Sequence, residues 1–469
     1  MNRRPLAYLL SSIAILIPCF WHGRIQAGDL GSHIYNAWLA QLVEAGRAPG
    51  LAIVPQTTNV LFDCLLKFLL DAFGANVAQH IAVPLAVLVF VWGAFAFVRR
   101  VSEHEPWHLL PVVAMLAYGW VFRMGLFNFY ISLGLCFWAM ALAWRGKPRD
   151  LAIAGVLLAV AYVAHGLPVA WAVALLAYRW VAGRLNRRQR MMLLGAALAA
   201  IVLARVVLQS MWKTVWFPQQ FTALVAIDQL WIYGGKYVLL AAALLLCWAL
   251  LLAGWMRSKG PATVASGVPF QICALTAAGI LIIPDWIRIP GYNHALVFLA
   301  ERMSLALGIC LCALTGAASV RKVVRYGIPA IALAFFAYSY ADESALNGLE
   351  DRMEELVLRL PPGQRVVTAV MDLQVATNPT THMIDRVCLG RCYSYGNYEP
   401  SSAQFRVRVN GASPLVVAAD ADANALQNGT YVVKPSDLPL YQVMADPSGN
   451  LSIRVLYAGQ HSDITPWNW

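Results

Sequence analysis

The chain has 469 residues, of which 60% are hydrophobic and only 13% are charged, and its mean hydropathy is +0.60. A soluble chain would carry about a quarter charged residues, so this composition excludes an ordinary soluble protein and indicates a polytopic membrane protein. The net charge of +11 does not indicate a nucleic-acid partner, because basic residues of membrane proteins gather in cytoplasmic loops and at helix ends.

The first apolar segment, residues 6–20, follows Arg3 and Arg4 and resembles a signal peptide in length and charge. No small-residue cleavage pattern follows it, and the next side chains, Phe20, Trp21 and His22, are bulky. We therefore expect an uncleaved membrane span.

Stretches long and apolar enough to cross a bilayer recur along the chain and predict about eleven spans. They fall near residues 6–21, 77–98, 107–122, 125–144, 150–164, 168–183, 191–210, 237–256, 268–285, 301–319 and 326–341. With a cytoplasmic N-terminus, every basic cluster lies in a cytoplasmic connection, as the positive-inside rule requires. These clusters are Arg99 and Arg100; Arg145, Lys147 and Arg149; Arg184, Arg187, Arg188 and Arg190; Arg257 and Lys259; and Arg321, Lys322 and Arg325. The sequence thus predicts an α-helical polytopic membrane protein, with the N-terminus inside and the C-terminus outside.

This topology places the long first loop, residues 22–76, on the outer side. Its stretch 28–47, GDLGSHIYNAWLAQLVEAGR, predicts a helix that starts near Asp29. Residues three and four apart share a helix face, so Asp29, His33, Asn36 and Glu44 fall on one side, opposite an apolar side. We expect an amphipathic helix at the membrane surface with its carboxylates towards water. Asp29 is then either a capping residue at the helix start or a functional carboxylate just outside the first span.

The tail, residues 342–469, has a different composition and predicts a small external α+β domain beyond the membrane domain of residues 1–341. We expect a helix across residues 349–360 to lead this domain. The strand-prone runs fall at residues 365–371, 405–409, 415–418, 431–433 and 451–457. The segment 393–408, rich in Tyr, Arg and Gln, is expected to line a cleft facing the membrane domain.

Cysteine residues are informative mainly in the tail, since most others lie within apolar spans. The sequence His382-Met-Ile-Asp385-Arg-Val-Cys388-Leu-Gly-Arg-Cys392 leaves two interpretations open. His382, Asp385 and both cysteines could bind a metal, although their spacing fits no common zinc pattern. An oxidising outer compartment favours a disulfide between Cys388 and Cys392 instead.

The long outer loop with Asp29 in its DLxSH setting resembles the C-superfamily of integral-membrane glycosyltransferases (GT-C). The segments Gly125-Leu-Phe-Asn-Phe-Tyr130 and Ala164-His-Gly-Leu-Pro168 also resemble parts of bacterial membrane proteins placed near this superfamily. The resemblance implies a cell-envelope enzyme of the inner (cytoplasmic) membrane, surrounded by membrane lipids. It would take a sugar from a polyprenyl-phosphate donor and would carry its catalytic carboxylate in the first outer loop. The acidic pair more frequent in this superfamily is reduced here to one carboxylate, so a divalent metal, the sugar and the acceptor stay open.

The chemistry of such a transfer assigns roles to residues on the outer side. A carboxylate near the acceptor hydroxyl can act as the base, and fixed cations can neutralise the charge that develops on the phosphate. Asp29 is the candidate base, with His33 one turn away as an orienting group or a phosphate contact. The candidate substrate-binding residues are Arg123, His165, Arg205, Arg288 and Arg302, with Lys213 and Lys236 as further cations.

Each candidate also has a structural interpretation. Arg205 lies within an apolar span and could extend to the interface, while Arg302 adjoins Glu301 and could form an internal ion pair. His165 could belong to a tight turn. For the whole protein, the alternative functions are a transporter or lipid flippase, and a noncatalytic scaffold whose tail binds an envelope partner. Transporters of this kind carry paired broken helices and midplane charges, and the sequence has no such pairing.

Overall fold

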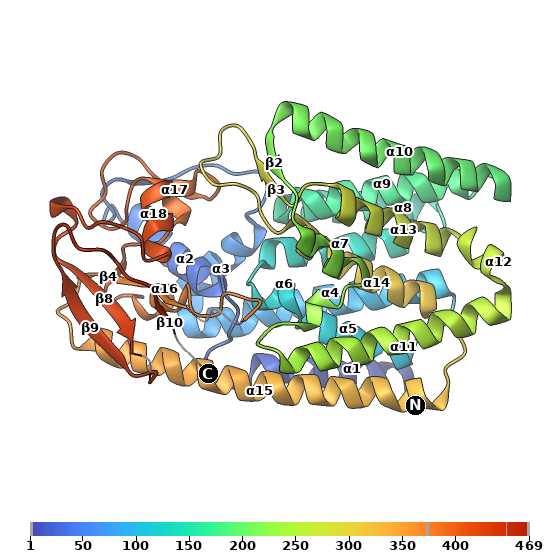
Figure 1. Ribbon diagram of the computed structural model, residues 1–469, viewed down its shortest axis with the longest axis horizontal. Coiled ribbons are helices and arrows are strands. Elements are labelled where there is room, and N and C mark those ends of the chain that lie inside the picture. The colour runs from blue at the N-terminus through green and yellow to red at the C-terminus, as the bar shows by residue number, and fades with distance from the viewer. Residues whose placement is uncertain (1–2, 372–374, 447, 467–469) are drawn as a thin grey trace.

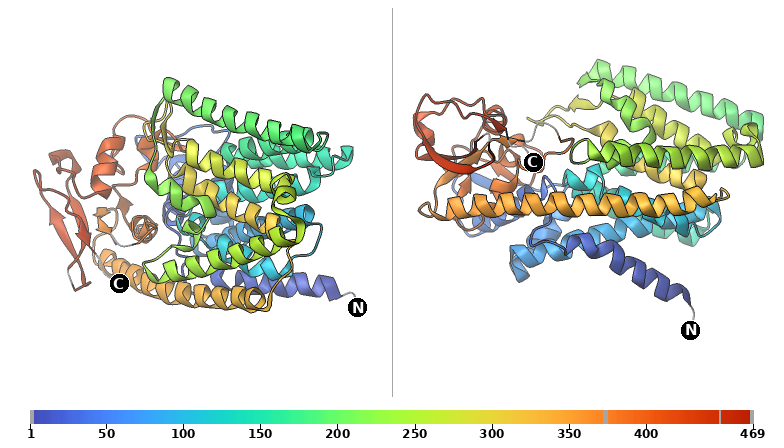
Figure 2. Two further views of the ribbon diagram at one scale, coloured as in Figure 1. Left: turned by 45° about the vertical axis from the view of Figure 1, so that its right-hand side comes forward. Right: turned by 60° about the horizontal axis from the view of Figure 1, so that its bottom comes forward.

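The computed structural model describes residues 3–371, 375–446 and 448–466. It is mostly helical, with a bundle of long helices and, at one end of that bundle, a tail that contains the larger β-sheet (Figure 1). Two further views show the same separation of bundle and tail (Figure 2). The start of α15 (Lys322–Leu358) lies at the bundle end remote from the tail strands.

The bundle contains helices of very different length, and all the predicted spans contain helix. In the part of the chain that the structure describes, four helices are long and apolar enough to cross a membrane: α4 (Ala75–Ser102), α10 (Arg187–Met211), α11 (Lys236–Lys259) and α15. The shorter bundle helices are α1 (Arg3–Leu16), α5 (Leu110–Ala117), α6 (Trp120–Arg123), α7 (Phe127–Ala143), α8 (Pro148–Ala164), α9 (Gly166–Ala182), α12 (Pro261–Ala265), α13 (Val268–Ile282) and α14 (Leu299–Thr315).

Large apolar side chains cover the outer surface of the bundle. Val156 of α8, Leu203 of α10, Leu239 of α11 and Leu333 of α15 are all exposed. Monomeric soluble proteins rarely expose contiguous apolar surface of this kind, so the bundle has the surface expected of a helical membrane domain.

The segment predicted as one span at residues 107–122 is not one helix. A 3₁₀ turn at Trp107–Leu109 precedes α5, and the helix is interrupted at Gly119 before α6 begins. The break brings another segment close, since a Cβ at Gly119 would lie 2.6 Å from the carbonyl oxygen of Gln229. The Gln229 side chain accepts a hydrogen bond from the Val121 amide (3.3 Å), which compensates for the interrupted helix.

The helix after Asp29, α2 (Leu30–Glu44), is not the amphipathic surface helix expected from the sequence. Its polar residues Ser32, His33 and Asn36 are buried together with its apolar ones. The helix α3 (Leu61–Phe73) packs beside it, and segments of the tail cover its polar side. The polar face therefore meets protein groups rather than water.

The tail begins within α15, a continuous helix of 37 residues, so the expected boundary at residue 342 falls inside that helix. The helix expected at residues 349–360 is its last part. The main tail sheet has the strand order β6-β4-β8-β9, in which β4 is parallel to both neighbours and β9 is antiparallel to β8. The strands are β4 (Arg365–Thr368), β6 (Tyr393–Ser394), β8 (Leu440–Ala445) and β9 (Leu451–Leu456).

Within the described residues, three further pairs of short strands form. They are β1 (Leu51–Ile53) with β7 (Val407–Val409), β2 (Lys213–Val215) with β3 (Trp286–Arg288), and β5 (Val370–Met371) with β10 (Thr465–Pro466). The short tail helices are α16 (Met383–Val387), α17 (Glu399–Ser402) and α18 (Asp420–Gln427). The expected strands at 415–418 and 431–433 do not form, while β8 was not expected. The β1–β7 pair joins the first loop to the tail.

Candidate functional site

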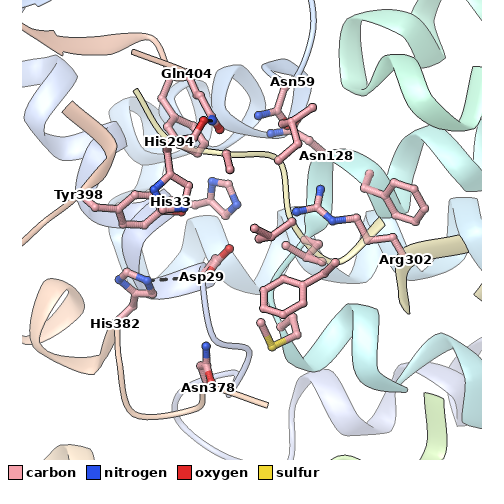
Figure 3. Close-up of a pocket in the computed structure, with 18 of the residues that line it drawn as sticks. Asp29, His33, Asn59, Asn128, His294, Arg302, Asn378, His382, Tyr398 and Gln404 are labelled. Atoms are coloured by element: carbon pink, nitrogen blue, oxygen red, sulfur yellow. Dashed lines mark hydrogen bonds and ion pairs between the residues drawn. The ribbon is translucent and has the colours of Figure 1, made fainter. Parts of the chain in front are cut away.

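A cavity of about 190 Å³ lies where the first loop, the bundle and the tail meet (Figure 3). Asp29, His33 and Asn59 of the first loop line it. The bundle and its loops add Asn128, Phe129, His165, Phe298 and Arg302 among others, and the tail adds Asn378, His382, Tyr398, Gln404 and Phe405. The tail segment 393–408 therefore lines a cleft facing the bundle, as the sequence predicts.

Close backbone packing places Asp29 at this junction. The amide of Asp29 donates to the carbonyl oxygen of Met124 (2.9 Å), and that of Gly28 donates to the carbonyl oxygen of Arg123 (2.7 Å). Gly125 has a φ of +80°, and a Cβ there would lie 2.5 Å from the Asp29 nitrogen. Only glycine fits this position without strain.

Asp29 directly precedes α2, but its side chain forms no capping hydrogen bond. Its carboxylate is about a quarter exposed, at 23%, and faces the cavity. The capping interpretation of Asp29 therefore has no support in the side-chain contacts. The carboxylate instead approaches the imidazole of His382, with 3.7 Å between Asp29 Oδ1 and His382 Nε2.

His382 belongs to the tail and is held by a second carboxylate. Its Nδ1 lies 2.7 Å from Asp385 Oδ2, one helical turn further on, and the Ser394 hydroxyl donates to the other oxygen of Asp385. Burial opposes protonation of His382, but Asp385, Asp29 and Glu399 outweigh it and raise the pKa of His382 above its usual value.

His33 forms a similar pair on the first-loop side of the cavity. Its Nδ1 lies 2.6 Å from Asp63 Oδ1, and the Asn128 amide donates to Asp63 Oδ2 (2.8 Å). Burial again opposes protonation, but the negative charges of Asp63, Glu399 and Asp29 outweigh it and raise the pKa of His33 to about 9. His33 is therefore a cation at neutral pH, with its countercharge behind it on α3.

Arg302 of α14 reaches into the cavity from the side opposite His382 (Figure 3). It forms no ion pair with Glu301 or with any other residue in the described part of the chain. Asp29, Asp285 and Glu301 act on its charge from a distance, and the apolar side chains Leu126, Phe129, Val297 and Phe298 line the same cavity. A guanidinium without an ion-pair partner is well suited to bind an anionic group of a ligand.

His165 also lines the cavity, between α8 and α9. Its Nδ1 accepts a hydrogen bond from the Leu167 amide (3.2 Å), so it also begins α9. Burial, with a smaller effect of Arg302, lowers the pKa of His165 to about 3. His165 is therefore neutral and supplies a polar surface rather than a charge.

The structure does not bring the other predicted cations into the cavity. Arg205 donates to the Ile282 carbonyl (3.1 Å) between α10 and α13, and Arg288 is exposed and donates to the Asn293 carbonyl (2.8 Å). Arg123 is buried and pairs with Glu343 of α15 at 2.6 Å. Its guanidinium is thus neutralised inside the protein, and its backbone carbonyl accepts the hydrogen bond from the Gly28 amide.

The structure decides between the two interpretations of the tail cysteines, a metal site and a disulfide. Cys388 and Cys392 form a disulfide with 4.5 Å between their Cα atoms. His382 and Asp385 bond to each other instead of joining the cysteines. Across the residues that the structure describes, no three His, Cys, Asp or Glu side chains are grouped so that they could hold a metal ion.

Several residues of the site were not predicted as such from the sequence. Asp63 lies on α3, and nothing in its local sequence connects it with His33 thirty residues earlier. His382 was considered only with Asp385 as a metal ligand. Their i, i+3 spacing is compatible with a contact on one helical turn, but the partner Asp29 is distant in sequence.

The chain matches no protein-family model, no curated protein and no solved structure. The function must therefore be argued from the site itself. Its arrangement combines one partly exposed carboxylate, a cationic imidazole, an unpaired guanidinium and an apolar wall. Such a site can take a proton from a neutral group while it neutralises an adjacent anion.

Proposed function

We propose that this protein is a membrane glycosyltransferase of the GT-C type that moves a sugar from a polyprenyl-phosphate carrier to an acceptor. One observation carries this proposal: the carboxylate of Asp29 shares a cavity with the guanidinium of Arg302, which has no ion-pair partner in the described part of the chain, and apolar side chains line part of the same cavity. A lipid phosphate requires a cation beside an apolar path, and an acceptor hydroxyl requires a base, so the cavity offers each substrate its complement.

In the proposed reaction, Asp29 takes the proton of the acceptor hydroxyl. The acceptor oxygen forms a bond to the anomeric carbon of the donor sugar, and the bond from that carbon to the phosphate oxygen breaks. The electron pair of the broken bond stays on the lipid phosphate, whose new charge Arg302 and His33 stabilise. A single displacement of this kind inverts the anomeric configuration.

The lipid chain of the donor would leave the cavity along its apolar wall. Leu126, Phe129, Val297 and Phe298 form this wall on the bundle side. The tail side carries amide and phenol groups instead, from Asn378, Tyr398 and Gln404. This polarity supports a donor that enters from the bundle and an acceptor that enters beside the tail.

We further propose that the bundle crosses the inner membrane with about eleven spans and places the tail on the periplasmic side. The basic clusters between alternate predicted spans support this orientation, because cytoplasmic loops are enriched in Lys and Arg. Arg99 in the last turn of α4 and Arg4 near the start of α1 both approach Glu105, at 3.1 and 3.7 Å, so the N-terminal end of α1 lies beside this basic cluster.

The substitution Asp29→Asn tests the proposal because it keeps the shape of the side chain and removes its proton affinity. In membranes that contain the acceptor, release of polyprenyl phosphate from a panel of polyprenyl-phosphate sugars should fall by roughly 10²–10⁴-fold, the usual contribution of a general base. Binding of the donor should change little. Glu44→Gln is the matched control, since Glu44 lies on the same helix, pairs with Lys67 at 2.9 Å and does not line the cavity. A folded Asp29→Asn variant with normal transfer would overturn the proposal.

A further inference from the structure

His382 approaches the Asp29 carboxylate from the tail. Its Nε2 lies 3.7 Å from Asp29 Oδ1, and this is the ion pair that the structure gives for Asp29 within the described ranges. Both side chains line the cavity, but the imidazole is buried, with 5% of its side chain exposed, whereas Asp29 is 23% exposed and is the more accessible group. A substrate hydroxyl in the cavity would therefore meet Asp29 rather than His382.

The orientation of His382 is fixed from behind. Asp385 Oδ2 holds its Nδ1 at 2.7 Å, and the Ser394 hydroxyl fixes the other oxygen of Asp385. Asp385 and Ser394 are both buried, so no water competes for these hydrogen bonds. With Nδ1 engaged, the ring can direct only its Nε2 towards Asp29.

The short helix after His382 is attached firmly to the rest of the protein. Arg386 of α16 forms two hydrogen bonds with Glu350 of α15, at 2.7 and 2.6 Å, and a third with the Ile25 carbonyl at 3.0 Å. The disulfide between Cys388 and Cys392 closes the turn that follows α16. These contacts fix α16 against both α15 and the first loop.

Helix α2 packs directly on the backbone of His382. A Cβ at Gly31 would lie 2.2 Å from the His382 carbonyl oxygen, so only glycine permits this approach. The backbone segments that carry Asp29 and His382 are therefore held together by direct contact.

We infer that His382 is a positioning residue of the proposed transferase, contributed by the tail, which orients the Asp29 carboxylate through the Asp29–His382–Asp385 arrangement. The inference rests on the proposed function, in which Asp29 is the base. An imidazole held in one orientation beside a carboxylate restricts the rotation of that carboxylate. The tail would thus be part of the catalytic unit and not an independent binding domain.

Other titratable groups also face this pair and must be considered in any pH experiment. Asp29 is surrounded by His33 on α2, Arg302 on α14, and Tyr398 and Glu399 at α17, besides His382. His382→Gln leaves all of these in place and removes only the titrating imidazole. A change in pH dependence in this variant therefore reports on His382.

The test compares wild type, His382→Gln and Asp29→Asn in one purified, lipid-reconstituted preparation of the full chain. For His382→Gln we expect kcat to fall by roughly 10–100-fold, because a misplaced base loses orientation. We also expect the wild-type rate to fall at high pH as His382, whose pKa is raised mainly by Asp385, loses its proton, and His382→Gln to lack this limb of the profile. The affinity for undecaprenyl phosphate, a lipid phosphate without a sugar, should stay within about twofold of the wild-type value, because His382 lies on the tail side of the cavity and not beside Arg302.

The variant His461→Gln is the matched control, since His461 is an exposed histidine of the same tail, away from the cavity. If His382→Gln misfolds, Asp385→Asn provides the second measurement, because it keeps a hydrogen-bond acceptor for Nδ1 and should reproduce part of the kcat loss and of the change in the pH profile. Wild-type kcat and pH profile in His382→Gln, with Asp29→Asn inactive, would overturn the inference alone. An active Asp29→Asn variant would overturn the proposed function instead.

Discussion

The two histidines beside Asp29 are held alike but face it from different parts of the molecule. His33 lies on α2, with its Nδ1 2.6 Å from Asp63 of α3, and His382 lies in the tail, with its Nδ1 2.7 Å from Asp385. His382 directs its other nitrogen at Asp29, whereas His33 forms no ion pair with Asp29 in the structure. In both cases an aspartate holds the imidazole by its Nδ1. His382 is thereby placed beside Asp29, whereas His33 lines the cavity without pairing with Asp29.

This difference divides the cavity into two functional sides. The first-loop and bundle side contains the cations His33 and Arg302 and the apolar wall, which suits the phosphate and lipid of a donor. The tail side contains His382 and the amide and phenol groups, which suits control of the base and binding of the acceptor. Substitutions on the two sides should consequently affect donor binding and base chemistry in different proportions.

Replacing Arg302 should have the largest effect on the donor. Arg302→Gln removes the one guanidinium that lines the described cavity, and we expect polyprenyl-phosphate binding and transfer both to weaken, with transfer falling by roughly 10²–10³-fold. Equilibrium binding of undecaprenyl phosphate and initial transfer rates measure the two effects. Arg205→Ala is the control, since Arg205 contacts the Ile282 carbonyl outside the cavity. Normal donor binding in Arg302→Gln would contradict the proposal that the bundle side of the cavity binds the phosphate.

His33 should give donor binding a pH dependence. Its pKa is raised from 6.5 to about 9 by Asp63, Glu399 and Asp29 against the effect of burial, so its positive charge is present at neutral pH and is lost as the pH rises through about 9. Affinity for undecaprenyl phosphate in neutral phosphatidylcholine vesicles should fall over that upper range. His33→Gln should bind about tenfold more weakly at neutral pH and should lack this dependence. An unchanged pH profile in His33→Gln would contradict the division of the cavity.

Removing the tail disulfide should have the smallest effect. The closed loop is short, since Cys388 and Cys392 are four residues apart, so the chain-entropy contribution is about 2 kcal/mol, near the lower end of the usual range. In the double variant Cys388→Ser/Cys392→Ser, we expect a lower temperature of irreversible inactivation and a transfer rate reduced less than in His382→Gln. Thermal inactivation curves and initial rates provide both values. A loss of transfer larger than that of His382→Gln would show that the disulfide does more than hold α16.

The sequence predicts the helical bundle well because apolar composition alone determines where long helices form. Residues 77–98 and 237–256, for example, lie within α4 and α11. The features that could not be predicted depend on contacts between residues that are distant in sequence. The break at Gly119 depends on Gln229, the burial of the polar face of α2 depends on the tail, and β8 forms only beside β4 and β9.

The site was predictable in part. Asp29, His33, His165 and Arg302 were candidates by chemistry and location, and all four line the cavity. Arg123 carries the same charge but is neutralised by Glu343, a partner 220 residues later that no local pattern indicates. Asp63 and His382 were not predicted as members of this site for the same reason: their partners, His33 and Asp29, are distant in sequence and come close only when the chain folds.

A structure of the protein with undecaprenyl phosphate bound tests the central claim most directly. The account predicts the phosphate within hydrogen-bond distance of Arg302 and near His33, with the isoprenoid chain running past Phe129 and Phe298 and the Asp29 carboxylate left free for an acceptor. Lipid phosphate bound elsewhere, with the cavity at Asp29 unchanged, would contradict it.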